Sequence, residues 1–348
     1  MTLPAKQLGT SAMTISRTGF GAWAIGGGGW YYAWGSQDDD ASIAAIRHAI
    51  EAGVNWIDTA AVYGLGHSEE VIAKAVAAFP EADRPYVFTK CGLVWDENDP
   101  SAAPRNSMSP ASVRREVEGS LRRLNVESID LYQVHWPDTG GEALDYNDPQ
   151  SQVAGGTPLE EYWQVMADLK TEGKVRAIGL SNHSAEQVAA AERVAHVDVV
   201  QPPFSAISRG AADLIAQAEA AGTGVIVYSP MQSGLLTGAF TKERAAALPD
   251  DDWRKSHPDF TTGLDANLAL ANALVPVAER HGVSPGAVAV AWALAWPGIN
   301  GAIVGARTPE QVDGTIAAST LKLSVTDFEE ITHAIRTTGA GEGPVTPA

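Results

Sequence analysis

Side chains that could carry out chemistry lie directly after short apolar runs of the sequence. They are Asp58 and Tyr63 after the second such run, Lys90 at the end of the third, and His135 after the fourth. A phenol is a poor acid at neutral pH, because its pKa is about 10. The ammonium group of Lys90 would lower this pKa, and Asp58 can hold the ammonium in place. Together with His135, which can hydrogen-bond a substrate oxygen, these residues predict a proton donor beside a polarised carbonyl group.

A second set of residues suits a flat ring that bears an amide group. Hydride transfer to or from a carbonyl carbon requires a cofactor, because no side chain supplies hydride. Ser181 and Asn182 follow the fifth run and Gln201 ends the sixth, so hydroxyl and amide groups are available for a carboxamide. Tyr228, near the end of the seventh run, offers a flat face to an aromatic ring. These residues predict a nicotinamide pocket.

Taken singly, each polar residue has an ordinary structural explanation. Asp58 could cap a turn, His135 could be a satisfied core histidine, and Lys90 could be solvated. As a set they are different, because packing does not require polar residues at six successive strand ends. The set therefore indicates a functional site.

The elements that must position these side chains are predicted from eight apolar runs. The runs are rich in Val, Ile and aromatic residues with little polar alternation, which is typical of parallel strands covered on both faces. They span residues 18–23, 53–58, 86–90, 129–134, 175–180, 197–201, 224–229 and 300–305. Between them, hydroxyl–proline pairs that favour helix starts occur at 109–110, 157–158, 284–285 and 308–309.

Strands that alternate with helices in this way predict an α/β protein with a (β/α)8 TIM barrel, whose active site lies after the strands. A doubly wound sheet is the competing fold, but the glycine-rich segment GGGGWYYAWGSQ lacks the dinucleotide-binding spacing. Long loops are expected after strands 3, 4 and 7, at residues 92–108, 138–156 and about 231–265. Residues 6–19 alternate and predict an N-terminal hairpin that closes the opposite end.

Length and composition bound the domain organisation and the partners. The 348 residues are predicted to form a single domain, 1–348, with a core at about 10–335 and a flexible tail at 339–348. The net charge of −18 disfavours nucleic acid and anionic membrane. A single cysteine, no membrane span and no signal pattern favour the cytoplasm. The histidines show no metal-ligand spacing, so no metal is expected.

The chain resembles the aldo-keto reductases over about residues 10–335. The motifs that carry the resemblance are DTAAVYG, FTK, LYQVHWP, GLSN, VVQ, VYSP and GARTPEQV. The long segment from GAWAIGGGGW to NWIDTA and the motif SGLLTG resemble the bacterial branch that includes inositol-cluster and general-stress reductases.

The resemblance implies an enzyme, an NAD(P)H-dependent oxidoreductase that interconverts a carbonyl compound and an alcohol. It implies that Tyr63 is the general acid/base, with Lys90, Asp58 and His135 completing a tetrad. It also implies that Ser181, Asn182 and Gln201 hold the carboxamide and that Tyr228 stacks on the nicotinamide. Further cofactor-binding residues that it implies are Ser233, Gly305, Arg307 and Gln311.

Cofactor preference is predicted from the segment 304–315, which corresponds to the adenosine and 2′-phosphate site. Many relatives carry Asn against the adenine where this chain has Thr315. Phosphate binding then falls to Arg307, a planar cationic fork, and to the uncharged Gln311. NADPH is favoured, and NADH could also serve.

A substrate wall is expected from aromatic residues in the loops that follow the strands. The predicted substrate-binding residues are Trp30, Tyr32, Trp34, Trp95 and Trp136. The substrate itself would be a small carbonyl or hydroxyl compound such as an aldehyde, ketone or keto-sugar. Homo-oligomer formation is compatible with the sequence.

Two other functions are also weighed from the sequence. A cofactor-binding, redox-sensing regulatory subunit with little turnover could keep the same tetrad. A barrel hydrolase or lyase would need paired carboxylates or a metal set at the strand ends, where Asp58 stands alone.

Overall fold

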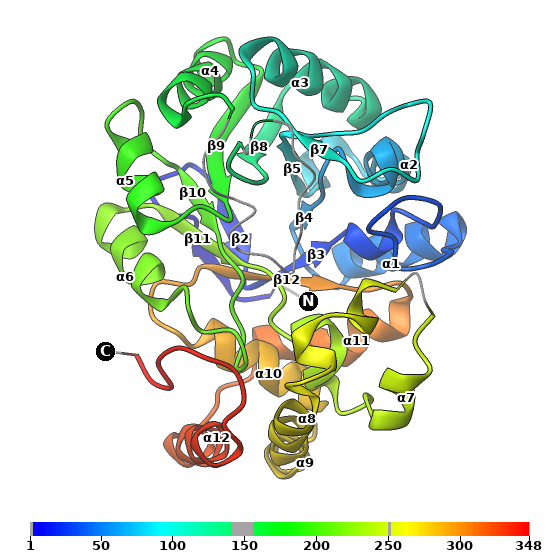
Figure 1. Cartoon of the computed structure of the whole chain (residues 1–348), viewed down its shortest axis with the longest axis vertical. Helices are drawn as coiled ribbons and strands as arrows, with labels where there is room; N and C mark the ends of the chain where they lie inside the picture. Colours follow the sequence, from blue (N-terminus) through cyan, green and yellow to red (C-terminus); the bar gives the residue numbers. More distant parts are fainter. Residues whose placement is uncertain (1–2, 139, 141–155, 250–251, 348) are drawn as a thin grey trace.

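A closed barrel of eight parallel strands forms the centre of the molecule (Figure 1). Residues 3–138, 140, 156–249 and 252–347 are described by a computed structural model of the chain. The barrel strands are β3 (Thr18–Gly21), β4 (Trp56–Asp58), β5 (Tyr86–Cys91), β8 (Ile129–Val134), β9 (Val175–Ser181), β10 (Val199–Gln201), β11 (Gly224–Val227) and β12 (Gly301–Gly305). Each barrel strand pairs with the barrel strand that follows it in the sequence, and β12 pairs with β3 to close the barrel. The predicted (β/α)8 barrel is confirmed.

Helices surround the strands on the outside of the barrel (Figure 1). Those that follow the first six strands are α1 (Asp39–Glu51), α2 (His67–Val76), α3 (Pro110–Leu124), α4 (Leu159–Thr171), α5 (Ala185–Glu192) and α6 (Ala212–Ala221). After β11 and β12 come α7 (Lys242–Ala246), α8 (Leu264–Ala273), α9 (Val275–His281), α10 (Pro285–Leu294), α11 (Pro309–Ile316) and α12 (Val325–Thr338).

The hydroxyl–proline pairs begin helices for a local physical reason. Ser109 and Ser284 are N-caps whose side chains accept a backbone N–H, and proline fixes the first helical φ where no donor is needed. Thr308 also caps its helix, although its side chain accepts no capping hydrogen bond. At the pair 157–158 the cap is Pro158 itself and α4 begins one residue later than predicted, while the Thr157 N–H donates to Asp138 Oδ2 at 3.1 Å.

The side chains inside the barrel change from apolar to polar over two residues along each strand. An apolar layer is formed by Trp56, Phe88, Leu131, Ala177, Val199, Ile226 and Ile303, one from each of seven strands. Two residues further along, the inward-facing positions are Asp58, Lys90, Gln133, Gly179, Gln201, Tyr228 and Gly305, which we call the polar layer. Alternate residues of a strand share a face, so the sequence places the polar layer at the carboxyl ends of the strands.

The opposite end of the barrel is covered by an N-terminal hairpin. β1 (Ala5–Gln7) and β2 (Thr14–Ser16) pair antiparallel, as predicted. Leu8, Met13 and Ile15 from this hairpin pack into the apolar layer. Polar chemistry is therefore confined to the other end of the barrel.

The long loops lie after the strands that were expected to carry them. Residues 92–108 contain a small antiparallel pair, β6 (Leu93–Val94) and β7 (Arg105–Asn106). The loop at 231–265 contains α7 and short 3-10 helices, including Gln232–Thr237 and Trp253–Lys255. Most of the predicted loop at 138–156 lies outside the described residues.

The C-terminal segment after α12 contacts the loop that follows β10. Arg209 is buried and donates hydrogen bonds to the carbonyl oxygens of Ala340 and Gly343. The Arg209 backbone N–H donates to Glu342 O. The single-domain organisation and the flexibility of residues 339–348 stay predictions. Among the described residues, no helix combines the length and apolar character needed to cross a membrane.

Candidate active site

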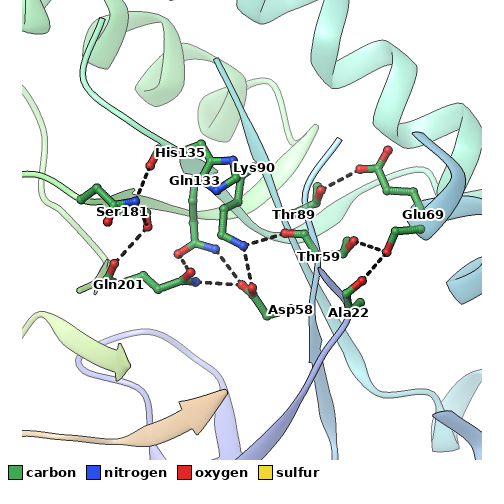
Figure 2. Close-up of polar contacts among 12 residues, drawn as sticks. Ala22, Asp58, Thr59, Glu69, Thr89, Lys90, Gln133, His135, Ser181 and Gln201 are labelled. Carbon is green, nitrogen blue, oxygen red and sulfur yellow. Dashed lines mark hydrogen bonds and ion pairs between the residues drawn. The ribbon is translucent and has the colours of Figure 1, made fainter. Parts of the chain in front are cut away.

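A buried ion pair lies at the carboxyl end of β4 and β5. The ammonium Nζ of Lys90 donates to Asp58 Oδ2 at 2.5 Å and to the Thr59 carbonyl oxygen at 2.8 Å. Lys90 is 1% exposed and Asp58 is 3% exposed. A charge is costly to bury alone, so each of these groups depends on the other. Figure 2 shows the pair between the two strands that supply it.

The loop after β4 brings Tyr63 over this pair. Nζ of Lys90 lies 5.2 Å from the centre of the Tyr63 ring, and the ring of His135 lies 5.7 Å from it in an edge-on arrangement. The turn that carries Tyr63 continues into Gly64, which has φ of +60°. A Cβ at this position would meet the Gly26 carbonyl oxygen at 2.1 Å, so glycine is required for the close approach of the two loops.

Burial sets the charge states of the basic groups around Tyr63. Desolvation lowers the pKa of His135 well below its ordinary value, and the nearby Lys90 cation lowers it further. His135 is therefore a neutral imidazole at physiological pH. Desolvation also lowers the pKa of Lys90, while the charge and the hydrogen bond of Asp58 oppose this shift.

Gln133 joins this group, although we did not predict it from the sequence. Its Nε2 donates to Asp58 Oδ1 at 3.3 Å, and its Oε1 accepts from Gln201 Nε2 at 3.0 Å. Gln201 Nε2 also donates to Asp58 Oδ1 at 2.8 Å. A period-2 signal was available, because Gln133 lies two residues before His135 and alternate residues of a strand face the same side.

The predicted carboxamide-binding residues are also close together. The Asn182 amide donates to the His135 carbonyl oxygen at 2.9 Å and to Ser181 Oγ at 3.1 Å, and its Oδ1 accepts from the Tyr228 hydroxyl at 2.7 Å. Asn182 has φ of +60°, a left-handed conformation that Asn tolerates better than most residues. Ser181 Oγ donates to the backbone carbonyl of Gln201 at 3.0 Å.

His183 fixes the backbone of this segment from behind. One ring nitrogen, Nδ1, is 2.7 Å from the Ser181 carbonyl oxygen, and Nε2 is 3.0 Å from the Tyr162 hydroxyl. Burial lowers the pKa of His183 to about 4, so the ring is neutral. A neutral ring donates from Nδ1 and accepts at Nε2, which satisfies both contacts.

A cavity of about 550 Å³ extends from these residues to the far end of β12. Its lining includes Asp58, Tyr63, His135, Ser181, Asn182, Gln201, Tyr228, Ser233, Gly305, Arg307 and Gln311. All predicted catalytic and cofactor-binding residues except Lys90, which lies beneath the surface, therefore line one cavity. Arg244 and Arg254 line it as well, so it carries cationic groups in a protein of net charge −18.

Arg307 is held by the loop that follows β3. Its Nε donates to Gln37 Oε1 at 2.5 Å, and a terminal nitrogen donates to the Ser36 carbonyl oxygen. Gln37 Nε2 donates back to the Arg307 carbonyl oxygen at 3.1 Å. The side chain of Gln311 accepts the Arg307 backbone N–H at 2.8 Å. The Arg307 end of the cavity is thus built from two loops that are far apart in the sequence.

The predicted aromatic residues divide into two groups. Trp30, Tyr32, Trp95 and Trp136 pack in one apolar cluster with Tyr63, and we call this cluster the aromatic wall. Trp34 lies elsewhere, because it lines the cavity beneath the guanidinium of Arg254 at 4.7 Å. A second, wider cavity of about 1630 Å³ opens over the wall and is lined by Trp30, Tyr32 and Trp136 but not by Trp95.

The loop after β11 reaches across to this aromatic group. Trp253 stacks on Trp23 with ring centres 5.9 Å apart, and Trp23 stacks on Tyr63 at 6.0 Å. Arg254, beside Trp253, pairs with Asp252 at 2.6 Å. This loop therefore contacts the region between the Tyr63 end and the Arg307 end of the cavity.

Comparisons with known proteins agree with this architecture. Residues 17–336 match the model of the aldo/keto reductase family. The chain belongs to the aldo/keto reductase family. It is 34% identical over 331 residues to aldo-keto reductase YhdN of Bacillus subtilis (strain 168), which covers 94% of this chain and 92% of that protein. It is 33% identical over 330 residues to the NADH-specific methylglyoxal reductase of Escherichia coli (strain K12), with coverage of 92% and 94%.

Among solved structures, the glycerol dehydrogenase AKR11B4 from Gluconobacter oxydans superimposes with a TM-score of 0.82 at 34% identity. This match covers 99% of this chain and 98% of that one. The predicted bacterial branch is confirmed by these relatives. This aldo-keto reductase is an oxidoreductase that interconverts carbonyl and hydroxyl groups with a nicotinamide cofactor.

The residues present fit such a cofactor. Gln201 lines the cavity, and among the described residues its Oε1 accepts no hydrogen bond, so this oxygen is free to accept from a carboxamide. The Tyr228 ring lines the same cavity, and Arg307 lies at its other end. Within the described parts of the chain, no group of three or more His, Cys, Asp or Glu side chains is arranged to hold a metal ion.

Proposed function

We propose that this aldo-keto reductase reduces a small, uncharged aldehyde, ketone or keto-sugar with NADPH, and that Tyr63 donates the proton. The observation that carries the proposal is the position of the Lys90 ammonium, 5.2 Å from the Tyr63 ring and paired with the buried Asp58. This cation favours the ionised form of the phenol and so makes proton release easier. The charge and the hydrogen bond of Asp58 raise the pKa of the ammonium against the desolvation that lowers it.

Each polar residue has one task in this proposal. The neutral His135 hydrogen-bonds the substrate oxygen and orients it toward Tyr63, which transfers the proton to it. When bound, the nicotinamide supplies hydride to the carbonyl carbon. Ser181, Asn182 and Gln201 hold the carboxamide, and Tyr228 lies against the flat face of the ring. In the oxidative direction Tyr63 accepts the proton from the alcohol.

The preference for NADPH rests on Arg307. The 2′-phosphate distinguishes the two cofactors, and a guanidinium binds phosphate through charge-assisted hydrogen bonds. Gln311 lies beside Arg307 and also lines the cavity. Arg254 is already paired with Asp252, and Lys242 pairs with Asp265 at 2.7 Å. No described carboxylate pairs with Arg307, which is thus better placed than these two cations, while Arg244 is a further cation of the cavity lining. The relative from Escherichia coli is named as NADH-specific.

The substrate class rests on the aromatic wall and on the rim of the wider cavity. Trp30, Tyr32 and Trp136 give an apolar surface against which a short carbon chain or a sugar ring can pack. The rim carries the carboxylates of Asp259 and Glu342 and the ammonium of Lys255, while Asp252 is paired with Arg254, so the rim keeps a net negative charge that disfavours an anionic substrate. The names of two relatives, a methylglyoxal reductase and a glycerol dehydrogenase, agree with small oxygenated substrates.

Steady-state turnover tests the proposal directly. The purified protein is assayed with NADPH and with NADH against a panel of short aldehydes, ketones and keto-sugars, and with polyols in the reverse direction. We expect turnover with at least one uncharged carbonyl compound, faster with NADPH. Tight cofactor binding without turnover on any member would favour the redox-sensing subunit, which the reductase names of the relatives do not support.

A further inference from the structure

The side-chain amide of Gln133 lies where the ion pair and the cofactor site meet. It is 0% exposed and its Cα pairs with Lys90 on one side and Gly179 on the other. Gly179 makes room for it, because a Cβ there would lie 3.1 Å from Gln133 Cγ and 2.8 Å from the Val199 carbonyl oxygen. Glycine at position 179 therefore leaves space in the polar layer for the Gln133 side chain.

The hydrogen bonds around Gln133 fix the direction of two amides in turn. Asp58 pairs with the Lys90 ammonium, and an ionised carboxylate only accepts hydrogen bonds. Gln133 must therefore direct its NH2 group at Asp58 Oδ1, which leaves its Oε1 to accept from the next amide. Figure 2 shows this chain from Asp58 through Gln133 to Gln201.

The consequence for Gln201 is a fixed orientation. An amide has two N–H donors, and Gln201 uses Nε2 for bonds to both Asp58 Oδ1 at 2.8 Å and Gln133 Oε1 at 3.0 Å. The remaining group, Oε1, is the part of the side chain that can meet a ligand in the cavity. Were the amide turned over, its oxygen would face the Asp58 carboxylate and the Gln133 oxygen, which repel it.

We propose that Gln133 is a positioning residue that holds Gln201 with its oxygen toward the cavity, so that the site selects a cofactor whose ring substituent donates an N–H. This inference rests on the proposed function, because it requires a nicotinamide carboxamide beside Gln201. Gln133 itself does not contact the cofactor. It acts through Gln201 and through the carboxylate they share.

The test compares two oxidised cofactors by binding alone. One is NADP⁺, and the other is its 3-acetylpyridine analogue, in which a methyl ketone replaces the carboxamide and no N–H remains. Dissociation constants are measured by quenching of tryptophan fluorescence for the wild type, Gln133→Leu, Gln201→Leu and the double variant. Leu131→Met is the matched control, because Leu131 is a buried, inward-facing residue of the same strand in the apolar layer.

We expect the wild type and the Leu131→Met control to bind the acetyl analogue about tenfold more weakly than NADP⁺, which is the loss of one buried hydrogen bond. In Gln133→Leu, Gln201 keeps its bond to Asp58 Oδ1 but loses the second bond that fixes its amide, so the ratio should fall part of the way toward one. Gln201→Leu should bring the ratio to about one, and the double variant should match Gln201→Leu, because Gln133 acts on this ratio through Gln201.

Two results would overturn the proposal. An unchanged ratio in Gln133→Leu would mean that Gln133 only supports packing, since a structural role weakens both cofactors equally. Additive effects in the double variant would mean that Gln133 does not act through Gln201. If Gln133→Leu does not fold, Gln133→Met serves in its place, because its unbranched side chain is similar in length and lacks the donor and acceptor. A wild type that binds neither cofactor would instead overturn the proposed function itself.

Discussion

Replacing Lys90 with Met should raise the apparent pKa of the essential acid in the pH dependence of kcat/KM. Methionine keeps the length of the side chain and removes the cation. The variant still contains Asp58, which is buried without its partner and takes up a proton more readily, so the shift calculated for the cation alone is an upper limit. What differs between the two proteins is the charge whose nitrogen lies 5.2 Å from the centre of the Tyr63 ring.

The size of the shift follows from that distance. At an effective dielectric constant of about 20, one unit charge at 5.2 Å changes the energy of an ionised phenol by about 3 kcal/mol. One pKa unit corresponds to about 1.4 kcal/mol, so the apparent pKa should rise by at most about two units. Because burial lowers the pKa of Lys90, the difference between the two proteins should shrink at high pH, where the wild-type ammonium loses its proton.

The assay is a pH profile of carbonyl reduction, followed by the absorbance of the reduced cofactor. Lys170→Met is the control, because Lys170 forms a partly exposed ion pair with the buried Asp198 at 2.6 Å outside the site. The control should keep the wild-type profile, and circular dichroism verifies that both variants fold. A Lys90→Met profile with the wild-type shape and position would refute the idea that this cation tunes Tyr63, whatever the loss in rate.

Three further predictions concern the cofactor, the stability and the substrate wall. Arg307→Ala should raise the dissociation constant of NADPH roughly ten- to a hundredfold and that of NADH little, since a charge-assisted hydrogen bond is worth about 1.5–3 kcal/mol; equal losses would place Arg307 elsewhere on the cofactor. As the pH falls from about 7 to 5, His183 of the unfolded chain binds a proton, whereas the buried His183 of the folded protein does not. The wild type should therefore lose about 2 kcal/mol more unfolding free energy over this range than His183→Gln, as measured by urea titration. Equal losses of unfolding free energy in the two proteins would contradict a neutral His183. Trp136 lines both cavities, so Trp136→Ala should raise the KM of the carbonyl substrate roughly tenfold and the dissociation constant of the cofactor less, and the opposite pattern would remove Trp136 from the substrate wall.

The barrel was predictable because its signals are local. Each strand is a short apolar run, and each helix start carries a cap that can be recognised without knowing what it packs against, as at Ser109 and Ser284. The order of strands followed from the alternation, because consecutive parallel strands pair through right-handed connections. The start of α4 differed by one residue, with Pro158 and not Thr157 at the cap.

The candidate site was predictable only in part. Residues near the carboxyl ends of strands, such as Lys90 and Gln201, lie at the same end of any closed parallel barrel, so their proximity followed from the fold. The partners of Arg307 could not be predicted, because Gln37 and Ser36 reach it from a loop whose conformation has no periodic signal. Trp34 separated from the aromatic wall for the same reason.

The central claim is that Tyr63 transfers the proton, and single-turnover kinetics of Tyr63→Phe test it most directly. The ring remains in the variant, so its packing against Trp23 and His135 and its affinity for NADPH should be preserved. Excess protein loaded with NADPH is mixed with the best carbonyl substrate, and oxidation of the cofactor is followed in time. The account predicts a rate constant about 10²–10⁴-fold below that of the wild type, with an unchanged dissociation constant for NADPH. A rate within a few-fold of the wild type would contradict it.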